Sequence, residues 1–176
     1  MNRSPVMERL ARALAIVGGL VLVFITLLTV VSITGRAFVR HGLGPIPGDF
    51  ELVEALTAFA VFSFLPWCQV TRSHATVDVF TSFFSDRVNR VIDLVTEILM
   101  TVIIVLIAWR LWYGMWDKIR YNEVTFILQF PVWWGFAAAM VASAIAVVIS
   151  FYMLGVRIGE VRSGRSAFAP TLGAVH

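Results

Sequence analysis

The sequence alternates between long apolar runs and short segments rich in charge, glycine and proline. Residues 13–35 contain no charged side chain, and neither do residues 124–156. The second of these runs is longer than one crossing needs, so we place its helix from Pro131 onward and assign residues 124–130 to the surface. About 20 apolar residues span a bilayer as a helix. The pattern therefore predicts an all-α membrane protein with four transmembrane helices, over residues 13–35, 52–71, 91–111 and 131–154.

The segments between these runs are predicted connectors. Residues 36–51 combine charged side chains with glycines and prolines, a composition typical of a loop and not of an embedded helix. Glycine, serine and arginine dominate after residue 156. We therefore predict one transmembrane domain, residues 1–156, followed by a polar cytoplasmic tail, residues 157–176.

The segment between the second and third spans has a two-sided pattern. At 100° per residue its apolar side chains, Phe80 among them, gather on one side and its polar side chains on the other. This pattern predicts a short amphipathic helix in the membrane interface, with Phe80 as an anchor, before a long helix that begins near Asp86. His74 and Asp78 are four residues apart, so we expect them to pair and fix this short helix at the headgroup level.

Composition supports a membrane protein and excludes several other classes. Hydrophobic residues make up 59% of the chain and charged residues 14%, and the mean hydropathy is +0.86, which excludes a disordered or ordinary soluble chain. The net charge of +3 comes from basic residues at the ends of apolar runs, so we expect no nucleic-acid partner. The single cysteine cannot form an intrachain disulfide.

Basic residues also predict the orientation. Nine of the 14 Lys and Arg residues lie in the N-terminus, the loop between spans two and three, and the tail, whereas five lie in the other two loops. Because Lys and Arg are enriched in cytoplasmic loops, we predict that both termini are cytoplasmic.

Catalytic and cofactor signatures are missing from the sequence. It contains no HExxH, nucleophile elbow, phosphate-binding loop or dinucleotide fingerprint. The histidines, His41, His74 and His176, lie outside the spans, where they cannot ligate a membrane haem. The sequence therefore predicts a protein that is not an enzyme and needs no cofactor or metal.

Ionisable side chains in the spans are the remaining candidates for function, because such groups are costly in hydrocarbon. Glu54 and Arg110 lie near span ends, where a snorkelling position is expected. Glu97 extends the polar face of Asp86, Asn89 and Asp93 into the membrane. Two interpretations stay open for Glu97: a carboxylate that faces a partner or an ion, and a locally paired glutamate near the cytoplasmic boundary.

This arrangement resembles the small, four-helix membrane subunit of tripartite ATP-independent periplasmic (TRAP) transporters. The resemblance covers about residues 8–156. It rests on the prolines and acidic pair before span two, an Arg-x-His-x-x-x-Asp segment after it, two arginines before span three and a Pro-x-Trp start of span four: Pro45, Pro47, Glu51, Glu54, Arg72, His74, Val77, Asp78, Phe80, Arg87, Arg90, Pro131 and Trp133.

The resemblance implies a scaffold in the bacterial inner membrane and not the transport pathway itself. In that family a large permease subunit carries the substrate and sodium sites, and a periplasmic binding protein delivers an organic acid. Together with the polar stripe that ends at Glu97, it gives a set of candidate residues for contact with the partner or for anchoring in the interface: Glu51, Glu54, Arg72, His74, Asp78, Phe80 and Glu97.

Two alternatives remain open on the sequence. One is an autonomous, homo-oligomeric transporter that uses Glu97 as a proton-coupled carboxylate. The other is a structural membrane anchor of a different complex, which would share the scaffold role but lack the sodium-driven partner.

Overall fold

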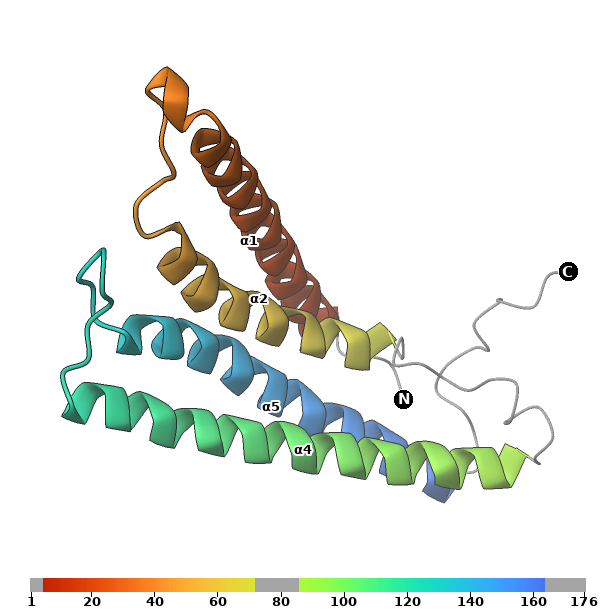
Figure 1. The fold of residues 1–176 in the computed structure, drawn as a ribbon. Helices are drawn as coiled ribbons and strands as arrows, with labels where there is room; N and C mark the ends of the chain where they lie inside the picture. The colour runs from red at the N-terminus through yellow and green to blue at the C-terminus, as the bar shows by residue number, and fades with distance from the viewer. Residues whose placement is uncertain (1–4, 72–85, 164–176) are drawn as a thin grey trace, which may run out of the picture.

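The computed structural model describes residues 5–71 and 86–163, and in these the chain is helical apart from its connecting loops (Figure 1). Four helices are long and apolar enough to cross a membrane, which confirms the predicted all-α membrane architecture. The helical elements are α1 (Pro5–Ala37), the 3-10 turn η1 (Val39–His41), α2 (Asp49–Thr71), α4 (Asp86–Arg120) and α5 (Trp133–Ser163). The predicted amphipathic helix between the second and third spans lies outside the described residues.

The helix α5 continues beyond the point where the sequence predicts a polar tail. It ends at Ser163, so Arg157, where the predicted tail begins, lies within the helix. Arg157 and Glu160 are packed inside the chain and form an ion pair there.

The four long helices form a row in the order α1, α2, α5, α4. The contacts join α1 to α2, α2 to α5 and α5 to α4, whereas α1 touches α5 only slightly. Figure 1 shows α1 and α4 on the outer sides of the row, with α2 and α5 between them. The arrangement is therefore open and not a closed bundle around one axis, and each outer helix has a large unpacked face.

Small side chains allow α5 to lie close to its neighbours. Its fully buried positions include Ala139, Ala142 and Ala146, and Gly135 lies so close to α2 that an added Cβ would be 3.1 Å from the Ala55 Cβ. Without a hydrophobic driving force between helices in lipid, close packing of small residues is a main source of association.

A small apolar core closes the row at the end where α1 begins and α5 ends. Ala11 of α1, Val70 of α2, and Ile149 and Met153 of α5 pack together there. The opposite end is joined by the α1–α2 loop, where buried Ser32 donates a hydrogen bond to Asp49 at the start of α2. Each end of α1 is thus tied to α2.

The closest approach of α1 to α2 generates a prediction about Gly18. A Cβ added at Gly18 would lie 2.6 Å from the Ser63 Cβ, so Gly18→Leu must push the two helices apart. We expect a loss of about 1–3 kcal/mol in the free energy of unfolding, the usual cost of overpacking. Denaturant titration of the purified chain in detergent measures it.

Gly19→Leu is the matched control, because nothing lies within 4 Å of a Cβ added there. Equal destabilisation by the two substitutions would contradict the proposed contact.

Candidate functional site

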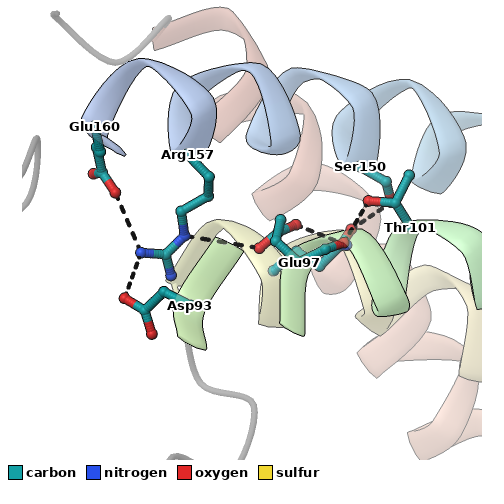
Figure 2. Close-up of polar contacts among 7 residues, drawn as sticks. Asp93, Glu97, Thr101, Ser150, Arg157 and Glu160 are labelled. Carbon is teal, nitrogen blue, oxygen red and sulfur yellow. Dashed lines mark hydrogen bonds and ion pairs between the residues drawn. The ribbon is translucent and has the colours of Figure 1, made fainter. Parts of the chain in front are cut away.

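Polar side chains, all of them buried except the half-exposed Asp93, gather at the end of the row where α4 begins and α5 ends (Figure 2). On α4, Asp93, Glu97 and Thr101 are four residues apart and therefore share one face. On α5, Ser150 and Arg157 share a face two turns apart. We call this set the polar cluster; its members are Gln69, Asp93, Glu97, Thr101, Ser150, Arg157 and Glu160.

Arg157 is the single guanidinium of the cluster and meets three carboxylates. Its Nη1 donates to Asp93 Oδ2 at 2.8 Å and to Glu160 Oε2 at 3.3 Å. Its Nε lies 4.0 Å from Glu97 Oε2, and this nitrogen is buried without a hydrogen-bond partner among the described residues. The Arg157 residue is 8% exposed. These contacts join α4 to α5 through a charged side chain, which would be costly in hydrocarbon without its partners.

A second branch of the cluster reaches α2 through Gln69. The Gln69 Nε2 donates to Glu97 Oε1 at 3.3 Å, and its Oε1 accepts a hydrogen bond of 2.7 Å from the Ser150 hydroxyl. Gln69 is 1% exposed and Glu97 9% exposed. One amide therefore links α2, α4 and α5, using both its donor and its acceptor.

A second set of polar contacts holds the opposite end of the row. The chain between α4 and α5 forms a hairpin, residues 121–132, closed by an antiparallel bridge between Val124 and Pro131. The Glu51 carboxylate on α2 accepts the amide protons of Ile127 at 2.6 Å and Leu128 at 2.9 Å. We call this contact the Glu51 clamp. It fixes the tip of the hairpin to the start of α2.

The predicted site residues are distributed differently from the expectation. Glu97 and Glu51 lie in contacts within the chain, in the polar cluster and in the clamp. Glu54 is exposed on α2 and makes no hydrogen bond or ion pair with the described residues. Arg72, His74, Asp78 and Phe80 lie outside the described residues.

Arg157, Gln69 and Ser150 were missed by the sequence analysis. Arg157 follows a long uncharged run, which predicts that a tail begins there, although Glu160 three residues later has a helical spacing that indicates a pair. Gln69 is an amide within an apolar span, which is itself a signal of an inward-facing polar contact.

Both sites consist of contacts between elements of the chain. In the described part of the chain, no group of three His, Cys, Asp or Glu side chains has an arrangement that could hold a metal ion. The carboxylates of the polar cluster accept hydrogen bonds or lie beside the Arg157 guanidinium, and those of the clamp accept backbone protons. Such contacts position helices and connect them.

Comparison with known families gives a match over most of the chain. The family model described as "Tripartite ATP-independent periplasmic transporters, DctQ component" matches residues 25–158, which is well over half of the chain. Searches of curated proteins and of solved structures found no match.

Removal of the Arg157 charge tests the polar cluster. We expect Arg157→Leu to lower the free energy of unfolding by about 3–5 kcal/mol, because it leaves buried carboxylates without their counter-charge. Denaturant titration in detergent measures the change. Arg162→Leu, at an exposed position of the same helix, should alter stability little. A small effect of Arg157→Leu would show that α4 and α5 do not depend on this contact.

The Glu51 clamp predicts local protection of the hairpin. Glu51→Ala removes the acceptor of the Ile127 and Leu128 amide protons, so hydrogen exchange of these amides should accelerate by about tenfold. Exchange measured by mass spectrometry on the purified chain resolves this segment. Glu54→Ala, one turn further along α2, is the control and should leave exchange unchanged. Equal exchange in both variants would rule out the clamp.

Proposed function

Because the chain belongs to the DctQ component family of TRAP transporters, we propose that it is the scaffold on which the large membrane subunit of such a transporter is mounted. Membership makes it a multi-pass membrane protein and the small subunit of a transporter, in a family that is not enzymatic. Beyond membership, we propose the scaffold role, the identity of the partners and the energy source.

Polar side chains face the inside of the row and apolar side chains face outward, and this distribution supports the proposed scaffold role. The polar cluster is buried between α2, α4 and α5, whereas the outer faces of α1 and α4 expose large apolar side chains such as Leu20, Phe24, Leu99 and Leu106. A pathway for an organic acid would require polar groups that converge on a cavity. Outward apolar faces instead suit lateral contact with lipid and with another membrane subunit.

Connections at both ends of the row favour a subunit whose helices keep fixed positions relative to one another. The polar cluster joins three helices at one end, and the Glu51 clamp joins α2 to the α4–α5 hairpin at the other. Relative sliding of α2, α4 and α5 would break charge-assisted hydrogen bonds at one end or the other. A transporter whose large subunit moves needs such a fixed frame.

The proposal assigns a side of the membrane and a set of contact residues. Both termini and the polar cluster lie on the cytoplasmic side, and the hairpin lies on the periplasmic side, following the distribution of Lys and Arg. Glu54, exposed on α2, is a candidate contact with the large subunit. Arg72, His74, Asp78 and Phe80 remain candidates for contact or anchoring on the cytoplasmic side.

The partners in this proposal are a large permease subunit, a periplasmic substrate-binding protein and the bilayer. The transported compound is an organic acid, delivered by the binding protein, and a sodium gradient drives its uptake through sites in the large subunit. The family match supports the existence of these partners.

Reconstitution tests the proposal. We expect uptake of a labelled organic acid into proteoliposomes only when this chain, the large subunit and the binding protein are all present and a sodium gradient is applied. Omission of each component in turn provides the controls. Uptake by this chain alone would favour the autonomous transporter, and uptake by the other two components without it would contradict the scaffold role.

A further inference from the structure

The tip of the hairpin exposes apolar side chains at one end of the helices. Phe126 is 90% exposed and Ile127 54% exposed, and no charged side chain occurs from Val124 through the rest of the hairpin. Exposed apolar side chains in water are unfavourable in proportion to their area. The tip therefore needs a covering surface that the described part of the chain does not provide.

Several backbone groups of the tip are paired within the chain. Glu51 accepts the amide protons of Ile127 and Leu128, the Phe130 amide donates to the Thr125 hydroxyl at 3.2 Å, and the Gln129 side chain donates to the Phe126 carbonyl at 3.0 Å. The Thr125 amide also donates to the Phe130 carbonyl at 2.9 Å. Non-helical backbone tolerates a low-dielectric surrounding only when its polar groups are paired in this way.

The clamp also sets the level of the tip along the membrane normal. Leu128 packs against Gly48, where an added Cβ would lie 2.3 Å from the Leu128 Cγ. The 23 residues of α2 begin directly after Gly48 and, at about 1.5 Å per residue, measure about 34 Å, close to the thickness of a bilayer core of about 30 Å. The tip thus lies where the hydrocarbon meets the headgroups.

Aromatic rings lie at the second half of the hairpin and the start of α5, and along the last turns of α4. Phe130 stacks on Trp134 with ring centroids 6.4 Å apart, and Trp134 meets Trp133 edge to face at 6.2 Å. At the end of α4, Trp112 stacks on Trp116 at 6.5 Å, and both rings are exposed. Tryptophan is enriched at membrane interfaces because its ring is apolar and its N–H is polar.

We infer that the hairpin is a membrane-interface anchor, in which Phe126 and Ile127 insert into the headgroup and acyl boundary of the leaflet on that side. Figure 1 shows the hairpin crossing from the end of α4 towards the start of α2, along the end of the row and not along a helix. Its uncharged tip offers no charge complementarity to a protein partner, whereas its paired backbone and aromatic neighbours suit lipid. The Lys118–Glu123 ion pair at the base, 2.6 Å long, lies at the polar side of this boundary.

A fluorescent probe at the tip tests this inference. Cys68→Ala removes the single cysteine, and Phe126→Cys then accepts an environment-sensitive label in the full chain. The labelled chain is reconstituted, alone and with the large subunit, into vesicles of phosphatidylcholine and phosphatidylglycerol. Quenching is measured with lipids brominated near the top of the acyl chain and with aqueous iodide.

Three further label sites provide the reference. Arg40→Cys lies in the other loop at the same end and reports on water, and Leu20→Cys lies on the outer face of α1 and reports on lipid. Ile127→Cys repeats the measurement at the tip, in case replacement of Phe126 itself changes the insertion.

The expected result is bromolipid quenching at Phe126 and Ile127 at least about twofold stronger than at Arg40, with correspondingly weaker iodide quenching, in both preparations. Iodide quenching equal to that at Arg40 in both preparations would overturn the inference. Protection from iodide and from bromolipid only when the large subunit is present would also overturn it, in favour of a protein contact. None of these outcomes depends on transport, so the inference and the scaffold proposal fail separately.

Discussion

A charged side chain within a membrane domain must find its partners inside the protein, and Arg157 is where this chain meets that requirement most directly. Its guanidinium lies beside carboxylates from two helices, and one of these, Glu97, also accepts a hydrogen bond from Gln69 on a third helix. A buried charge without a partner is costly, and pairing removes much of this cost. The register of α4 and α5 is therefore the one that keeps these groups together. The position of α2 follows from the Gln69 amide, which accepts from α5 and donates to α4.

The opposite end depends on backbone groups in place of charged pairs. An irregular hairpin close to the membrane would leave amide protons without acceptors, and Glu51 supplies two acceptor oxygens for them. Between the two ends the contacts come from small side chains, with Gly18 against Ser63 and the buried Ala142 and Ala146 on α5. Polar contacts at the ends thus set register and orientation, whereas small residues in the middle set the distance between helices.

The sequence was sufficient for the number and approximate place of the long helices, because charge-free runs such as residues 13–35 admit few other interpretations. It was also sufficient to separate the surface segment before Pro131 from the following helix. The burial of Arg157 in α5 could not be predicted from its own segment, because its partners Asp93 and Glu97 lie on another helix. Contacts such as Gln69 with Ser150 join residues distant in sequence, and no periodicity along one helix contains that information.

An open row of helices has a consequence for how much surface is available to a partner. Only 11% of the residues in the most apolar stretch of α1 are buried, and 17% in α4, against 44% in α5. A closed bundle would bury the inner face of every helix. The open row buries less apolar surface within the chain and exposes two broad apolar sides. The polar contacts at its ends compensate for that loss by holding the row together. The same contacts that satisfy buried polar groups therefore leave the outer faces free for lipid and for a larger subunit.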